Sequence, residues 1–382
     1  MKLSIHMLIL NGSSVVERAL RPLAKIEAEV VVVDTGSTDG TPEVIQHLCE
    51  SVFPGDYGKE ARLSCRIAAR ISPESHSDMF FIDSASSWEA EMPGPFTGRP
   101  ILRDWAKARN MGLDACEGEY IMKLDADDEI VEGAANIPSA LKFLDEHPRI
   151  DFLMCPYEVM EPFTPNPLHG FPVRDHIETI TMYDRIWRNE PFIRFELPIH
   201  ERLVGKGTSQ NLPNWYMVAQ GLRFRDWRDS PGEGVRLAYR NCKVFMIEYE
   251  RRVKAGLEMS PGFLLSTIGE LTEINPKLAL SLLNLASSRD PRKRHDFDHQ
   301  LSLGRACGRI GLDQVALEAF KAAASLAPNS ASSHLELGFQ LQLIGSSGWK
   351  GELSKGIEIA ESMSGFNVDH RMLRRARQCL TT

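Results

Sequence analysis

The 382-residue sequence has no apolar run long enough to cross a membrane, and its cysteines follow no metal-binding pattern. A membrane-spanning helix needs about 20 consecutive apolar residues. The N-terminal apolar stretch is shorter and is followed by no small-residue cleavage site. The seven cysteines form no C-x-x-C pair, and no histidine-rich tract occurs, which argues against a structural zinc site. We therefore expect a cytoplasmic protein with reduced cysteines.

The sequence also lacks an excess of positive charge. Its 44 Lys and Arg against 52 Asp and Glu give a net charge of -8, which argues against a generally basic nucleic-acid binder and leaves room for a local basic patch. The length is enough for two domains with a large core.

Two apolar runs end in carboxylates. The first is residues 30–34, ending at Asp34, and the second is residues 120–128, which contains Asp125 and Asp127. Parallel strands buried on both faces have this composition, and α/β sheets bind ligands beyond the carboxyl ends of their strands. The two acidic ends therefore predict one crevice, suited to a divalent cation and a phosphorylated ligand.

Residues 1–232 alternate between strand-like and helix-like segments, which predicts an α/β domain with a mainly parallel sheet. Thr41 is expected to cap a helix whose first residue is Pro42. Strands are expected at 3–10, 29–33, 79–82, 120–124, 152–157 and 179–188, with shorter pieces in 192–203, and helices at 15–26, after 41 and at 103–116.

Residues 233–382 have helical periodicity without a convincing strand, which predicts a second, all-α domain. One helix–turn–helix repeat of 34 residues fits the tetratricopeptide pattern, and its first half recurs 34 positions later. A generic helical bundle is the alternative. The repeat positions are Leu303, Gly304, Cys307, Gly311, Ala316, Phe320, Ala323 and Pro328, followed by Leu337, Gly338, Leu341 and Gly345.

The triplet from Asp125 to Asp127 places two carboxylates on one side of an extended chain end. Hard oxygen ligands suit Mg²⁺ or Mn²⁺, which commonly bridge protein carboxylates and substrate phosphates. The D-x-D spacing is weak evidence alone, and its place after an apolar strand strengthens it.

Several motifs in this order resemble the family 2 glycosyltransferases, which have the GT-A fold. The motifs are VDTGSTDGT at 33–41, ARNMGL at 108–113, GEYI at 118–121 and LDADD at 124–128. A further piece, YDRIWR at 183–188 followed by IHE at 199–201, resembles a subgroup that often carries tetratricopeptide-like C-terminal helices. That subgroup includes lipopolysaccharide-core glucosyltransferases and peptide S-glycosyltransferases. The resemblance implies a GT-A nucleotide-sugar-binding domain with a Rossmann-like mixed sheet over residues 1–232, and a helical-repeat domain over 233–382.

The resemblance implies roles for individual residues. Asn11, Asp34, Arg109 and Asp125 match positions that contact the nucleotide sugar. A helix-capping role for Asp34 and a structural ion pair for Arg109 are the alternatives.

The same resemblance implies a metal site and a catalytic base. Asp125, Asp127 and His200 match positions that hold Mn²⁺ or Mg²⁺. An inverting transfer needs a carboxylate to take the acceptor's proton, and Glu201 is the first choice, with Asp184 and Glu196 in reserve.

The resulting hypothesis is a metal-dependent inverting glycosyltransferase that uses a nucleotide sugar, first of all a UDP-sugar. The acceptor stays open among a surface glycan or lipopolysaccharide, a peptide or protein, and a hydroxymethylated base of phage DNA. Basic clusters around Arg292 and Arg371 are either solvated helix faces or a docking surface for an anionic acceptor.

Two rivals come from other classes. One is a catalytically inactive GT-A scaffold whose helical repeats bind a partner. The other is a nucleotidyltransferase, which the absence of a Gly-rich loop with Lys or Arg after the first strand argues against.

Overall fold

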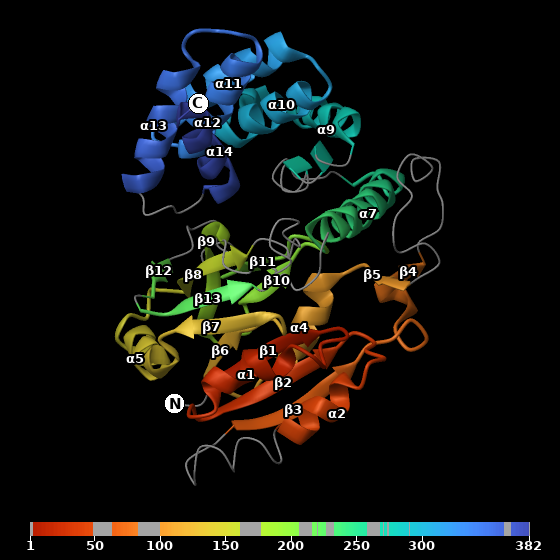
Figure 1. The fold of residues 1–382 in the computed structure, drawn as a ribbon. Helices are drawn as coiled ribbons and strands as arrows, with labels where there is room; N and C mark the ends of the chain where they lie inside the picture. The colour runs from red at the N-terminus through yellow and green to blue at the C-terminus, as the bar shows by residue number, and fades with distance from the viewer. Residues whose placement is uncertain are drawn as a thin grey trace, which may run out of the picture. The chain divides into compact units, whose positions relative to one another are not determined.

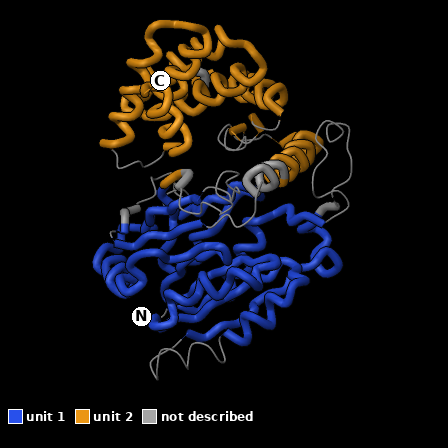
Figure 2. Tube along the Cα trace, in the orientation of Figure 1, with its two compact units in different colours: residues 1–85, 96–176, 181–231 blue, residues 86–95, 177–180, 232–382 orange. Residues whose placement is uncertain are grey.

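The computed structural model of the protein describes residues 3–48, 63–82, 100–160, 177–205, 216–219, 221–226, 233–257, 268–269, 271–272, 275–289, 291–362 and 368–381. Their contacts group them into two compact units (Figures 1 and 2). Unit 1 comprises residues 1–85, 96–176 and 181–231, and unit 2 comprises 86–95, 177–180 and 232–382. That a folding domain ends at residue 232 and another begins at residue 233 stays a prediction.

Unit 1 is built on a nine-stranded mixed sheet in the order β3-β2-β1-β6-β9-β8-β13-β7, with β12 paired to β8. Its first half is parallel: β1 pairs with β2 and with β6, and β2 pairs with β3. This register brings the ends of β1, β2 and β6 to one edge, where Ile9 lies beside Asp34. The strands of this half are β1 (Leu3–Ile9), β2 (Ala28–Asp34), β3 (Leu63–Arg70) and β6 (Tyr120–Lys123).

The second half makes the sheet mixed instead of mainly parallel. Strand β9 is antiparallel to β6, and β13 is parallel to β8 and antiparallel to β7. The acidic turn between β6 and β7 thus starts in the parallel half and ends at the far edge. The strands are β7 (Asp128–Glu132), β8 (Phe152–Met160), β9 (Ile177–Arg188), β12 (Tyr216–Val218) and β13 (Arg223–Asp226).

Apolar side chains cover both faces of the sheet. One core joins alternate residues of β1 and β2, such as Ile5 and Val30, to α1, α2 and α5. The opposite face packs Val31 and Ile121 against Leu113 of α4 and Trp187. The helices are α1 (Val16–Leu20), α2 (Thr41–His47), α4 (Trp105–Ala115) and α5 (Ile137–Glu146). The α/β fold expected from the sequence is confirmed.

Two local predictions need correction. The helix expected over 15–26 is the five-residue α1 followed by the short 3-10 helix Arg21–Leu23. Thr41 does not cap α2: Gly40 is the N-cap, with a φ of 82°, and Thr41 is the first helical residue. The Thr41 hydroxyl instead binds the loop after β1, as described below.

Two small antiparallel pairs lie outside the main sheet. One pairs β4 (Phe80–Ile82) with β5 (Pro100–Leu102), and the other pairs β10 (Arg194–Glu196) with β11 (Arg202–Val204). The second pair frames the segment that carries His200.

In the described part of residues 233–381, all regular secondary-structure elements are helices. Helices α10 and α11 form one hairpin, and α12 and α13 form the next. Gly304 and Gly338, 34 residues apart, have the same function in the two hairpins: an added Cβ would meet Phe320 and Leu353 at 2.5 and 2.6 Å. This equivalence confirms the tetratricopeptide-like architecture. The helices are α7 (Glu233–Lys254), α9 (Pro276–Arg289), α10 (Phe297–Arg309), α11 (Asp313–Leu326), α12 (Ala331–Leu343), α13 (Trp349–Ser362) and α14 (His370–Thr381).

Within the described ranges, no helix is both long enough and apolar enough to cross a membrane. Five of the cysteines are free, and Cys65 of β3 is disulfide-bonded, which departs from the expectation of uniformly reduced cysteines.

Candidate active site

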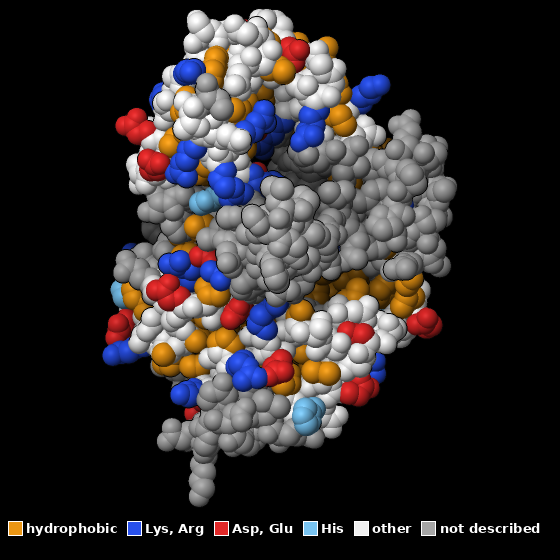
Figure 3. Space-filling model, in the orientation of Figure 1, with side chains coloured by type: hydrophobic (Ala, Val, Ile, Leu, Met, Phe, Trp, Pro, Cys, Tyr) orange, Lys and Arg blue, Asp and Glu red, His pale blue; other side chains and the backbone are white. Residues whose placement is uncertain are grey.

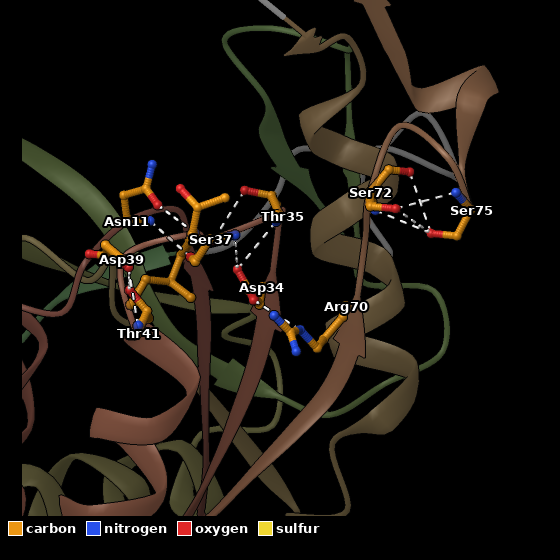
Figure 4. Close-up of polar contacts among 12 residues, drawn as sticks. Asn11, Asp34, Thr35, Ser37, Asp39, Thr41, Arg70, Ser72 and Ser75 are labelled. Atoms are coloured by element: carbon orange, nitrogen blue, oxygen red, sulfur yellow. Dashed lines mark hydrogen bonds and ion pairs between the residues drawn. The ribbon is translucent and has the colours of Figure 1, made fainter.

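Asp34 shapes the turn at the end of β2. Its side chain is fully buried, and its Oδ1 accepts hydrogen bonds from the backbone N–H groups of Gly36 and Ser37 at 3.2 and 2.9 Å (Figure 4). The Oδ2 atom lies 3.3 Å from Nε of Arg70, at the end of β3. Asp34 therefore sits where a strand-end ligand would be bound, and it also has a structural role.

Asn11 lies beside that turn. Its backbone N–H donates to Ser37 Oγ at 2.9 Å, and its Oδ1 accepts from the Thr38 N–H at 2.8 Å. Its φ of 51° is in the left-handed region, which asparagine tolerates better than most residues. The structure thus brings Asn11 and Asp34 together through one short polar turn.

Asp39 joins the same two loops. It accepts hydrogen bonds from the backbone and hydroxyl of both Ser13 and Thr41, while Thr41 Oγ1 accepts from the Gly12 N–H at 2.8 Å. Burial alone would raise the pKa of Asp39, but these hydrogen bonds lower it to about 2. Asp39 therefore joins the loop after β1 to the loop after β2 through hydrogen bonds.

The acidic residues after β6 lie in a tight turn and not on an extended chain end as expected. The turn is closed by the Asp128 N–H, which donates to the Asp125 carbonyl at 3.0 Å. Asp125 Oδ1 lies 2.9 Å from Arg109, and its Oδ2 lies 3.1 Å from Lys123. Burial would raise the pKa of Asp125, but these cations hold it far below its usual range. Asp125 is therefore fully ionised, with both oxygens next to a cation.

Asp127 has the opposite surroundings. Its side chain is exposed in the turn, although many other protein groups lie around it. Desolvation there, followed by the negative charges of Asp226, Asp128 and Asp125, raises its pKa well above the usual value. Of the two D-x-D carboxylates, Asp127 is the one whose charge the surroundings leave unbalanced.

Arg109, on α4, connects the acidic turn to the segment near residue 200. Its side chain is buried, and its Nε lies 2.6 Å from Glu201 Oε1 while Nη2 reaches Asp125. Burial would raise the pKa of Glu201, but Arg109 lowers it. The Nη1 of Arg109 is also buried and has no hydrogen-bond partner among the described residues. Arg109, Asp125 and Glu201 thus form one charged cluster.

The rest of the α4 motif has a structural explanation. Asn110 Nδ2 donates to the Phe195 carbonyl at 2.9 Å, and its Oδ1 accepts from the Phe195 N–H at 3.0 Å. Gly112 has no room for a Cβ beside His6, and at Gly118 a Cβ would lie 2.6 Å from the Ser4 nitrogen. The two glycines let the chain pass close to β1, which places Arg109 at the strand ends.

His200 lies in a turn fixed to α4. The Pro198 carbonyl accepts from the Trp105 N–H at 3.0 Å. Leu197 and His200 have φ values of 75° and 51°, a conformation that costs free energy for non-glycine residues and recurs at functional sites. The neighbouring Glu201 binds Arg109, so His200 belongs to a segment tied to the acidic turn.

Asp184 lies on β9, beside the cations Lys123 and Arg185. It is half-buried, and burial raises its pKa although both cations oppose that effect. Its proton affinity is therefore shifted in the direction opposite to that of Glu201.

Sequence reasoning missed Arg185 and Tyr157, which hold Asp128. Arg185 Nη1 lies 2.6 Å from Asp128 Oδ2, and the Tyr157 hydroxyl donates to Asp128 Oδ1 at 2.8 Å. The only sequence signal was the place of Arg185 within YDRIWR. Asp128 is thus a structural carboxylate behind the turn.

The donor set of the turn fits a divalent cation in part. No group of three His, Cys, Asp or Glu in the described ranges is placed to hold a metal ion, so Asp125, Asp127 and His200 do not form such a group by themselves. Asp127 offers a carboxylate among other carboxylates, where a cation would offset the repulsion. Mg²⁺ is usually held by one or two carboxylates together with substrate phosphates. Asp127 and a bound diphosphate would meet that requirement.

The basic cluster at the C-terminus is partly neutralised. Arg371 pairs with Asp369 and Arg377 with Glu361, both at 2.9 Å, and Arg375 lies over the Phe339 ring. On the face shown in Figure 3, side chains of both signs are present on the described part of unit 2. This arrangement resembles a solvated helix surface more than a strongly basic one.

Comparison with known families identifies part of this site. Residues 99–199 match the family model described as Glycosyl transferase family 2. Residues 99–199 therefore belong to a family 2 glycosyltransferase domain. The match includes Arg109, Asp125, Asp127 and Asp184, and it confirms the resemblance read from the motifs.

A curated relative is a TPR repeat-containing protein of Synechococcus elongatus. It is 23% identical over 221 residues, which are 57% of this chain and 40% of that protein. The chain thus spans less than half the length of this relative.

Several solved structures are similar at low scores. S. aureus TarS 1-349 has a TM-score of 0.35 at 17% identity, covering 90% of this chain and 92% of its own. Its complex with UDP-GlcNAc has a TM-score of 0.36 at 16% identity, covering 91% and 93%. YrrB, described as a TPR protein with an unusual peptide-binding site, has a TM-score of 0.29 at 20% identity, covering 38% and 74%.

Proposed function

We propose that this chain is a glycosyltransferase that moves a sugar from a nucleotide sugar to an acceptor nucleophile, with inversion at the anomeric carbon. A UDP-sugar is the first candidate for the donor. Asn11 and Asp34 would meet the nucleoside, and the acidic turn would meet the diphosphate. The acceptor is a surface glycan, a peptide or protein, or a nucleic-acid base.

The contrast between Asp125 and Asp127 carries this proposal. Asp125 is held ionised by Arg109 and Lys123, whereas Asp127 lies among carboxylates. One balanced and one unbalanced carboxylate at the ends of parallel strands suit a ligand that brings both phosphates and a cation.

The bound cation, Mn²⁺ or Mg²⁺, would supply Lewis-acid stabilisation of the leaving diphosphate, with Asp127 and the predicted His200 as its protein ligands. Arg109 fixes Asp125 and Glu201 relative to one another.

A carboxylate must accept the acceptor's proton as the new bond forms. The sequence places Glu201 first, but Arg109 lowers its pKa and so weakens it as a base. Burial raises the pKa of Asp184, which makes it the stronger base. We therefore propose Asp184 as the base, with Glu201 as the alternative.

A donor screen tests the function without knowledge of the acceptor. Purified protein is incubated with Mn²⁺ and a panel of nucleotide sugars, and free nucleotide is measured. We expect slow cation-dependent release from one or a few donors. Asp127→Asn should abolish that release, whereas Asp114→Asn, which changes an exposed carboxylate of α4, should not alter it.

Two results would contradict the proposal. One is the absence of both release and nucleotide binding with every donor, which would favour the inactive scaffold. The other is release that persists unchanged in excess chelator, which would remove the cation from the mechanism.

A further inference from the structure

The acidic turn is held from behind by one buried arginine. Arg185 Nη1 donates to Asp128 Oδ2 at 2.6 Å and to the Lys123 carbonyl at 3.3 Å. Lys123 is the last residue of β6 and Asp128 is the first of β7. One guanidinium group therefore contacts both ends of the turn that carries Asp125 and Asp127.

Asp128 passes this restraint on to the turn. Its Oδ2 also accepts from the Asp125 N–H at 2.9 Å, and its Oδ1 accepts from the Tyr157 hydroxyl at 2.8 Å. The Asp128 carboxylate is fully buried and bonded on both oxygens. The backbone of Asp125 is thus fixed to a group that Arg185 and Tyr157 hold in place.

The environment of Arg185 leaves it little freedom. Its side chain is 1% exposed, and its guanidinium carbon lies 4.5 Å from the centre of the Tyr157 ring and 4.8 Å from that of Phe224. Charged hydrogen bonds are stronger where water is excluded. A planar group between two rings, with contacts in fixed directions, is a use of arginine that lysine does not reproduce.

We propose that Arg185 is a positioning residue for sugar transfer: through Asp128 and the Lys123 carbonyl it fixes the turn that presents Asp125 and Asp127 to the donor and its cation. The inference rests on the proposed function. Arg185 touches no reacting group, so its effect passes through the turn.

The test compares three variants. Arg185→Lys keeps the charge but not the planar fork, and Tyr157→Phe removes only the hydroxyl that binds Asp128. Arg188→Lys is the matched control, because Arg188 lies on the same strand and binds Asp145 and the Leu144 carbonyl instead of the turn. Nucleotide release is measured against Mn²⁺ concentration, and UDP binding with Mn²⁺ is measured by calorimetry.

We expect Arg185→Lys to raise the Mn²⁺ concentration for half-maximal release by roughly 10-fold, the factor for a lost hydrogen bond to a charged group, and to weaken UDP binding in parallel. Tyr157→Phe should shift both readouts in the same direction by a smaller factor. Arg188→Lys should match the wild type.

If Arg185→Lys does not fold, Tyr157→Phe decides the question alone. The inference is overturned if folded Arg185→Lys and Tyr157→Phe have the Mn²⁺ dependence and UDP binding of Arg188→Lys while the wild type is active. A wild type that neither releases nor binds nucleotide would overturn the proposed function, and this inference with it.

Discussion

Unit 1 and helices α10–α14 of unit 2 bury different kinds of side chain. Unit 1 buries charged side chains close to its strand ends, among them Asp34, Arg109, Asp128 and Arg185. In helices α10–α14 of unit 2, no buried side chain of the described residues is Asp, Glu, Lys or Arg, and close contacts such as Gly304 on Phe320 hold the helices together.

The buried charges indicate which part of the chain holds the functional site. Buried ions are costly unless they are paired, and hydrophobic packing of similar volume often stabilises a protein equally well. Their concentration around one turn therefore indicates a site, whereas helices α10–α14 bury apolar side chains and a few polar ones. Substitutions of charged residues should therefore affect nucleotide release more strongly in unit 1 than in unit 2.

The largest effect is expected for Arg109→Met, which leaves Asp125 and Glu201 without their shared cation. We expect a loss of about 3 kcal/mol in the free energy of unfolding, the lower end for a broken buried pair because Asp125 is partly exposed, and a loss of nucleotide release. Chemical denaturation and the donor assay measure the two.

The pH dependence sharpens this prediction. The pKa values of Asp125 and Glu201 are lowered in the folded protein, so their pairing stabilises it above the unfolded pKa of about 4 and this contribution is lost as the pH falls below that value. The stability difference between Arg109→Met and wild type should therefore be full at pH 7 and shrink in acid. A difference that is constant from pH 7 to pH 3 would mean that lost packing, not charge, explains it.

An intermediate loss of activity is expected when the general base is replaced, and it should identify that residue. Asp184→Asn should reduce transfer by roughly 10²–10⁴-fold, with donor binding retained, because it removes the proton acceptor and little else. Steady-state rates and donor affinity are measured for this variant and for Glu201→Gln. If only Glu201→Gln shows the loss, the base is Glu201 and our choice from the pKa directions is wrong.

The smallest effect is expected in unit 2. Changing Arg371, Arg374 and Arg375 together to Gln should leave slow donor release unchanged, because these residues are remote in sequence from the donor motifs. Arg371 already pairs with Asp369, and Arg375 lies over the Phe339 ring. Release is measured at low and high salt. A weaker and less salt-dependent use of an anionic acceptor would contradict the view of a solvated surface and favour a phosphate-bearing acceptor.

The sequence was informative where apolar periodicity was strong. It predicted β1, β2, β6 and β8, the acidic strand ends and the 34-residue repeat. It missed β3, β7, β12 and β13, and charged residues interrupt the apolar alternation of β3, β7 and β13. Glu158, for example, binds Arg223 and Arg225 at 3.0 and 2.8 Å from a position more than 60 residues away.

The sequence indicated which residues belong to the candidate site, but not the different role of each one. Asp125 and Asp127 look equivalent along the chain. They differ in the fold because Arg109 and Lys123 form ion pairs with Asp125 and not with Asp127. Asp226, from a strand distant in the sequence, instead adds a negative charge near Asp127. Such long-range charge partners leave no local pattern, so Arg185 and Tyr157 were not foreseen either.

The place of β13 sets a lower limit on the length of a shortened chain. This strand pairs with β8 on one side and β7 on the other, yet residues 223–226 come after every other strand of unit 1 in the chain. A fragment that stops at residue 199, where the family match ends, would leave two open strand edges in the middle of the sheet. Open edges pair with other molecules and aggregate. An isolated catalytic fragment must therefore extend beyond Asp226.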